Sequence, residues 1–76
     1  MDMRVQVGRN VRRFRTRAGL SQEELAYRAQ LDRTYISGVE RGVRNPTVRV
    51  LQTIATVLAI HPADLLADGD DPPAPV

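Results

Sequence analysis

Apolar and small side chains recur at helical spacing along most of the chain, and no stretch alternates as a strand does. The first set comprises Val7, Val11, Phe14 and Ala18, with arginines at many of the positions between them. The pattern predicts an all-α fold of five helices, located over about residues 4–18 and 22–30, between Asp32 and Gly42, along Val48–Leu58, and over about residues 62–67.

Polar residues stand where these helices are expected to begin. Ser21 and Glu24 have the spacing of a capping box, and Leu20 and Leu25 flank them as a hydrophobic staple. Gly19 falls where a helix C-terminal cap is expected. The other predicted N-caps are Asp32, His61 before Pro62, and either Asn45 or Thr47.

The second and third predicted helices are separated only by a short corner, where Ala26 supplies the small side chain that close helices need. Two helices joined by a turn of about three or four residues form a helix-turn-helix, whose second helix can enter the major groove of DNA. The polar face of the third helix carries residue types that read base edges and bind phosphates, namely Arg33, Thr34, Ser37 and Arg41.

Length and composition limit the number of domains, the bound groups and the cellular location that we expect. The 76 residues predict one domain over residues 1–67 and a disordered, acidic and proline-rich tail over 68–76. With no cysteine and one histidine, we expect no disulfide, no metal site and no cofactor. Because no sensor domain or ligand pocket fits in this length, we expect no small-molecule ligand either. The chain has neither an apolar run of about 18 residues nor a signal peptide, so we expect a cytoplasmic, nucleoid-associated protein and no membrane partner.

The formal net charge of +2 is distributed unevenly. All eleven basic residues are arginines within residues 1–49, where five acidic residues leave a formal charge of +6. Residues 50–76 hold four acidic residues and no basic one, which gives −4. The asymmetry favours a basic face that binds a polyanion and a second region that binds another partner. A surface that is only solvated could carry the same charge imbalance.

With these elements in order, the chain resembles the lambda repressor-like, or Xre, family of helix-turn-helix regulators. The motifs that carry the resemblance are GLSQEELA, YIS-x-VERG, NPT and L-x-x-IA-x-VL, in this order between Gly19 and Leu58. Within the family, the chain is most similar to small stand-alone regulators such as restriction–modification controller proteins. The resemblance implies a compact five-helix domain that binds double-stranded DNA as a symmetric dimer.

The resemblance also implies roles for individual residues. It places the exposed start of the third helix in the major groove, where Arg33 is expected to donate to guanine and Thr34 and Ser37 to contact bases. For Arg33, a phosphate contact or plain solvation is the alternative, and for Tyr35 it is packing alone. The expected phosphate contacts are Arg17, Gln22, Tyr35, Arg41, Arg44 and Asn45, any of which is otherwise solvated.

A partly buried structural ion pair between Arg15 and Glu40 is a further implication of the resemblance. Two positions depart from the family pattern. Gln30 stands in the turn where relatives often carry glycine, which costs about 1 kcal/mol if the backbone there is left-handed. Gly38 lacks the longer polar side chain that many relatives carry in the recognition helix and that a base contact would use.

The last two predicted helices carry four apolar residues, Leu58, Ile60, Leu65 and Leu66. Part of this set must complete the core, and the remainder is the predicted dimer interface. A two-fold dimer would hold two recognition helices about 34–36 Å apart, against half-sites of a near-palindromic operator about 10–10.5 base pairs apart.

Other functions remain open at the level of sequence. An antitoxin would bind DNA and also hold a toxin through its acidic tail or last helix, and the neighbouring gene would distinguish it. A protein-interaction module would keep the fold without DNA binding, but the arginine-rich first half and the Arg33–Thr34 pair argue against it. An enzyme is not expected, because no catalytic constellation accompanies His61, which has the context of a helix cap.

Overall fold

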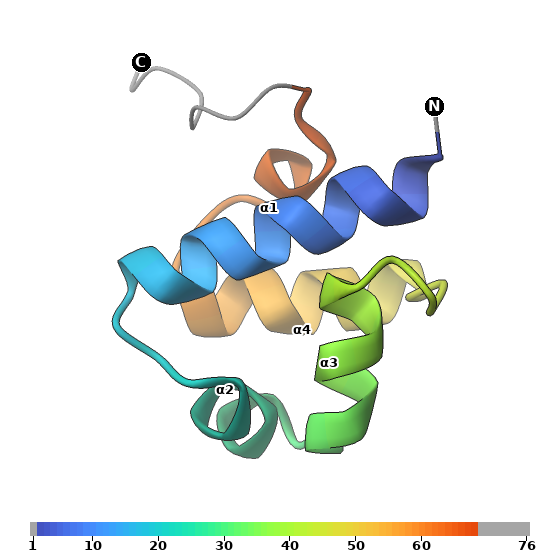
Figure 1. The fold of residues 1–76 in the computed structure, drawn as a ribbon. Helices are drawn as coiled ribbons and strands as arrows, with labels where there is room; N and C mark the ends of the chain where they lie inside the picture. The colour runs from blue at the N-terminus through green and yellow to red at the C-terminus, as the bar shows by residue number, and fades with distance from the viewer. Residues whose placement is uncertain (1, 69–76) are drawn as a thin grey trace.

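The computed structural model describes residues 2–68 and contains four α-helices and one short 3₁₀-helix (Figure 1). They are α1 (Met3–Arg17), α2 (Gln22–Ala29), α3 (Arg33–Glu40), α4 (Val48–Leu58) and η1 (Pro62–Leu66). The all-α prediction is confirmed for the described residues. The count of five α-helices is corrected, because the last element is closed by an i→i+3 hydrogen bond from the Asp64 N–H to the His61 carbonyl at 2.9 Å.

Side-chain caps explain where the helices begin. In the predicted capping box, the Ser21 hydroxyl accepts from the Glu24 N–H at 3.0 Å, and the Glu24 carboxylate accepts from the Ser21 N–H at 3.1 Å. Of the two candidates for α4, Thr47 is the cap. The remaining helices begin after caps at Asp2, Asp32 and His61.

Each of the four α-helices is followed within two residues by a residue whose φ is positive, namely Gly19, Gln30, Gly42 or Ala59. After α1, the Gly19 N–H donates to the Thr16 carbonyl and the Leu20 N–H to the Arg15 carbonyl, which is the Schellman arrangement. The backbone is left-handed at Gln30, with a φ of 57°, so the condition for its strain is met, and Ala59 has a φ of 58°. Two helix ends therefore place a side chain where glycine is the unstrained residue.

We expect Ala59→Gly to stabilise the fold by about 0.5–1 kcal/mol, because it removes the Cβ clash of a left-handed residue. Gln30→Gly should act in the same direction. Ala18→Gly is the matched control, since Ala18 follows α1 with an ordinary φ of −78° and should lose stability. Thermal unfolding measures all three, and equal losses in Ala59→Gly and Ala18→Gly would contradict the strain at Ala59.

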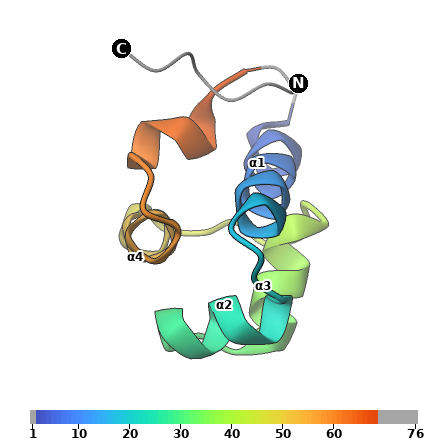
Figure 2. The same ribbon diagram turned by 90° about the vertical axis from the view of Figure 1, so that its left-hand side faces the viewer.

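The core lies between α1, α4 and the corner formed by α2 and α3. Figure 2 looks along α1 and shows it between η1 and α3, with α4 on the opposite side of the core. The apolar side chains with no exposed surface come from every element, namely Val11, Leu25, Ile36, Val39, Ile54, Ala55 and Leu65. The amphipathic spacing read from the sequence thus buries one face of each helix.

The structure divides the four apolar residues from which the dimer interface was predicted. Leu58 is 7% exposed and Leu65 has no exposed surface, so both complete the core of the single chain and offer almost nothing to a partner. Leu65 is covered because η1 packs against both α1 and α4. Ile60 remains half-buried and Leu66 is 46% exposed, and these two retain the predicted role.

Two amide side chains of α1 fasten the end of η1. The fully buried Asn10 donates from Nδ2 to the carbonyls of Leu65 and Ala67, at 2.9 Å each. One turn earlier, Gln6 donates from Nε2 to the Leu66 carbonyl at 2.8 Å. These bonds satisfy carbonyls at the end of a short helix that would otherwise lack partners.

The described part of the chain contains no helix that is long and apolar enough to cross a bilayer. The predicted tail over residues 68–76 lies, apart from the exposed Asp68, outside the described residues.

Candidate nucleic-acid interface

Helices α2 and α3 form the predicted corner. Three residues separate them, and the second of these, Leu31, donates its N–H to the Ala26 carbonyl at 2.8 Å. Ala26 is only 3% exposed, as expected for the small residue inside the corner. Asp32 then begins α3, its carboxylate accepting from the Thr34 N–H at 2.7 Å. This is the geometry of a helix-turn-helix.

The first two turns of α3 present the predicted base-contacting residues. Arg33 and Thr34 are exposed and Ser37 is half-buried. Ser37 lies four residues after Arg33 and three after Thr34, so the three side chains share one face of the helix. Figure 1 shows that this end of α3 lies beside α2 and far from α1. The polar face is therefore accessible to a long, narrow ligand.

The predicted phosphate contacts lie at several helix ends. Arg17 is exposed at the end of α1, and Arg41, Arg44 and Asn45 are exposed in and after the last turn of α3. Tyr35 is half-buried and packs against the core, so packing accounts for its ring.

A shallow depression of about 410 Å³ joins the start of α2 to the start of α3. Its lining residues are Arg15, Ser21, Gln22, Glu23 and Arg33. The first turn of α2 adds backbone N–H groups without intrahelical partners and the positive end of the helix dipole. Arg33 therefore stands next to a helix end that favours an anionic oxygen.

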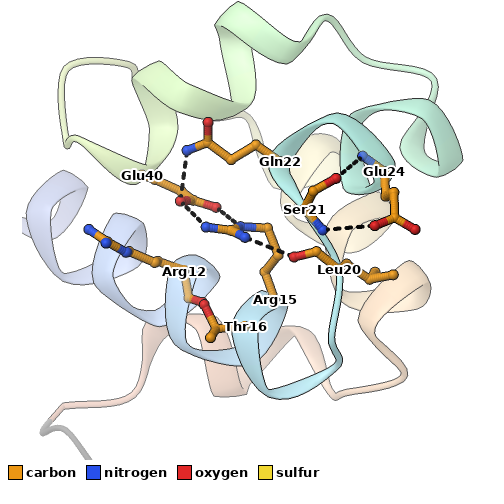
Figure 3. A network of polar contacts seen from close by, with 8 residues as sticks. All are labelled: Arg12, Arg15, Thr16, Leu20, Ser21, Gln22, Glu24 and Glu40. Carbon is orange, nitrogen blue, oxygen red and sulfur yellow. Dashed lines mark hydrogen bonds and ion pairs between the residues drawn. The ribbon is translucent and has the colours of Figure 1, made fainter.

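Behind this depression lies a network of polar contacts around the side chain of Glu40 (Figure 3). Arg15 donates to the two carboxylate oxygens of Glu40 from Nε at 2.6 Å and from Nη2 at 3.0 Å. From Nη1 it also donates to the Leu20 carbonyl at 2.8 Å. The side chains are 13% and 3% exposed, respectively, so the ion pair implied by the resemblance is present and largely buried.

The same carboxylate also holds Gln22. The Gln22 amide donates from Nε2 to Glu40 Oε1 at 3.0 Å, which leaves one of its two N–H groups for another acceptor. The hydrogen bonds to Glu40, together with its charge, raise the pKa of Arg15 above its ordinary value. One buried carboxylate thus ties together the end of α1, the start of α2 and the end of α3.

The contact between Gln22 and Glu40 was not predicted from the sequence, because it joins residues 18 positions apart on different helices. The role of Gly38 was also missed. A Cβ on this residue would lie 2.6 Å from Cγ of Arg44, so the Arg44 stem covers the glycine. The Gly38 carbonyl accepts from the N–H groups of Val43 and Arg44. Gly38 therefore faces the loop that carries Arg44.

The arrangement offers hydrogen-bond donors and positive charge. Within residues 2–68, no cluster of three histidine, cysteine or acidic side chains is placed to hold a metal ion. His61 is occupied as a helix cap, since its Nδ1 accepts from the Ala63 N–H at 3.0 Å. What the residues present is a surface for an extended polyanion.

Comparison with known proteins identifies relatives that are similar in sequence and in structure. The chain is 41% identical to the control protein C.BamHI of Bacillus amyloliquefaciens over 66 residues, which are 86% of this chain and 82% of that one. It is similar in structure to the restriction-modification controller protein C.AhdI of Aeromonas hydrophila, with a TM-score of 0.79 and 47% identity over 82% of this chain and 94% of that one.

A third relative has been solved with its ligand. The restriction-modification controller protein C.Esp1396I, as a tetramer in complex with its natural 35 base-pair operator, has a TM-score of 0.77 and 37% identity over 86% of each chain. A helix-turn-helix family model, HTH_3, matches residues 11–65, which span all four motifs of the resemblance. The family expected from the sequence is confirmed, and this chain belongs to the HTH_3 helix-turn-helix family.

Proposed function

We propose that this protein is a transcriptional regulator that binds double-stranded DNA in a sequence-specific manner, of the kind that restriction-modification controller proteins represent. The supporting observation is the first turn of α3, where Arg33 and Thr34 are exposed and Arg33 lines the same depression as Ser21 and Gln22 at the start of α2. C.Esp1396I, a relative of similar fold, occurs in complex with its operator. Such a regulator acts at the nucleoid in the cytoplasm.

In this proposal the two kinds of contact come from different residues. Arg33, Thr34 and Ser37 read bases, with Arg33 donating to the two acceptors of a guanine. Arg17, Gln22, Tyr35, Arg41, Arg44 and Asn45 hold phosphates on the flanks. Gln22 contributes its backbone N–H and the one amide hydrogen that Glu40 leaves available.

The active species in the proposal is a homodimer on a near-palindromic operator. Ile60 and Leu66 are the apolar residues of the last two helices that keep surface for a partner. One chain of this size buries little surface on a duplex, so two linked chains are needed for useful affinity. Sedimentation that detects only monomer, both with and without operator DNA, would contradict this part of the proposal.

Arg33→Ala and Arg44→Ala should weaken binding in different ways. Loss of Arg33 should cost about 1–3 kcal/mol for the preferred site and relax the preference at one base step of each half-site. Loss of Arg44 should weaken binding to all duplexes alike and make the salt dependence less steep. Titrations of operator and scrambled duplexes at several salt concentrations measure both effects.

Arg49→Ala is the matched control for these variants, because Arg49 is exposed on α4 and has no predicted role in binding. A wild-type affinity that did not fall with rising salt would contradict the phosphate contacts. An equal loss of affinity for operator and scrambled duplexes in Arg33→Ala would contradict base reading by this side chain.

A further inference from the structure

A second basic surface lies on α1. It consists of Arg9, Arg12, Arg13, Thr16 and Arg17, which line a shallow depression of about 490 Å³, and we refer to it as the arginine stripe. These positions recur every three or four residues, so they follow one side of the helix. Arg15, which points toward α3 and Glu40, lies on another side. The arginine stripe therefore lies apart from the α2–α3 corner, and the two surfaces meet only at Arg17, which is also a proposed phosphate contact.

The described chain ends next to this stripe. Asn10 holds the Ala67 carbonyl at 2.9 Å, and Gln6 holds the Leu66 carbonyl at 2.8 Å. Asn10 follows Arg9 directly and precedes Arg13 by three residues, or about one helical turn. The backbone of Ala67 is thus fixed at the edge of the stripe.

The residues that follow Ala67 are strongly acidic. Asp68, Asp70 and Asp71 fall within four positions, and no basic residue follows them. An extended chain advances about 3.3–3.6 Å per residue, so Asp70 and Asp71 can reach roughly 10–14 Å from Ala67. The rise of α1 from Asn10 to Arg17 is about 10 Å. The acidic segment is therefore long enough to follow the stripe to the end of the helix.

We propose that the acidic segment, residues 68–71, docks on the arginine stripe of the same chain. Opposite charges meet at a surface to which the segment is already tethered, so docking is intramolecular and its effective concentration is high. Because Arg9, Arg12 and Arg17 are exposed, pairs with them exchange with solvent and weaken as salt rises. The docked carboxylates neutralise much of a four-arginine surface that would otherwise attract any polyanion without regard to sequence.

The docking is tested without DNA by comparing arginine side-chain and backbone NMR resonances of the full chain and its variants. Asp70→Asn with Asp71→Asn should shift the resonances of Arg9, Arg13 and Arg17, and high salt should shift the wild type in the same direction. Asp70→Glu with Asp71→Glu should retain the wild-type positions. Arg49 on α4 is the internal control and should not move.

Two results would overturn the proposal. One is an asparagine variant whose α1 resonances match those of the wild type. The other is a pair of asparagine and glutamate variants that shift alike, which would show that charge is not the cause.

A second readout rests on the proposed function. At low salt, the asparagine variant should bind a scrambled duplex several-fold more tightly than the wild type, and adding Arg9→Gln and Arg13→Gln should abolish that gain. If these arginine substitutions weakened binding equally with and without the carboxylates, the stripe would be a DNA contact and docking would be refuted. If the protein bound no DNA, the proposed function would fail, and the DNA-free resonances would still decide the docking.

Discussion

Replacing Gly8 with alanine should lower the free energy of unfolding by about 3 kcal/mol. A Cβ on Gly8 would lie 2.7 Å from the carbonyl oxygen of Glu40 and closer still to that of Val39. Both atoms belong to the backbone of α3, so no side-chain rotation relieves the overlap and the two helices must separate. The gain in helix propensity from alanine, about 1 kcal/mol, is smaller than this loss.

Thr16→Ala is the matched control for Gly8→Ala, because it places the same residue at an exposed position of the same helix. It should change stability by no more than about 0.5 kcal/mol. Urea unfolding followed by circular dichroism measures both variants. If Gly8→Ala unfolded at the wild-type urea concentration, the close approach of α1 and α3 would be contradicted.

Replacing Glu40 with alanine should cost about 3 kcal/mol, the second large effect on stability. It leaves the guanidinium of Arg15 largely buried without its carboxylate and removes the acceptor of the Gln22 amide. The Arg15 contact with the Leu20 carbonyl compensates only in part. Because α2 begins at Gln22 and α3 ends at Glu40, the variant should also loosen the corner that presents Arg33.

A double-mutant cycle separates the ion pair from simple loss of packing. Arg15→Ala together with Glu40→Ala should cost about 1–3 kcal/mol less than the two single losses combined, because the double variant leaves no buried charge unpaired. Glu23→Ala is the control, since Glu23 is an exposed carboxylate on the neighbouring helix. Strictly additive losses would show that Arg15 and Glu40 do not stabilise each other.

The helix boundaries were predictable because the signals that set them are local. Ser21 and Glu24 are three residues apart, and their capping box involves only their own side chains and backbone. The start of α4 was ambiguous because Asn45 and Thr47 are both good caps. Their side chains cannot be ranked without the path of the preceding loop.

Positions whose roles depend on a distant partner were not predictable in the same way. Gly8 reads as a weak helix residue until α3 is seen to pass against it. Asn10 reads as a surface polar residue, yet it is fully buried because η1 returns to α1 and offers two carbonyls. Leu58 and Leu65 could not be separated from Ile60 and Leu66, since spacing alone does not show which apolar face η1 covers.

In the candidate site, too, some features are set by local sequence and others by contacts between distant residues. The exposed start of α3 follows from the cap at Asp32 and the apolar spacing of Ile36 and Val39, and both are local features. The hydrogen bond from Gln22 to Glu40 and the packing of the Arg44 side chain over Gly38 are tertiary contacts. The sequence thus predicted where the candidate surface lies, whereas the structure shows which contacts orient its side chains.

The most direct test of the account is selection of preferred duplexes from a random pool by the wild type and by Arg33→Ala. The wild type should select a near-palindrome whose half-sites are about 10 base pairs apart, and Arg33→Ala should select the same spacing but lose one base preference in each half-site. Duplexes without a two-fold repeat, or an identical consensus for both proteins, would contradict base reading by a dimer through the first turn of α3.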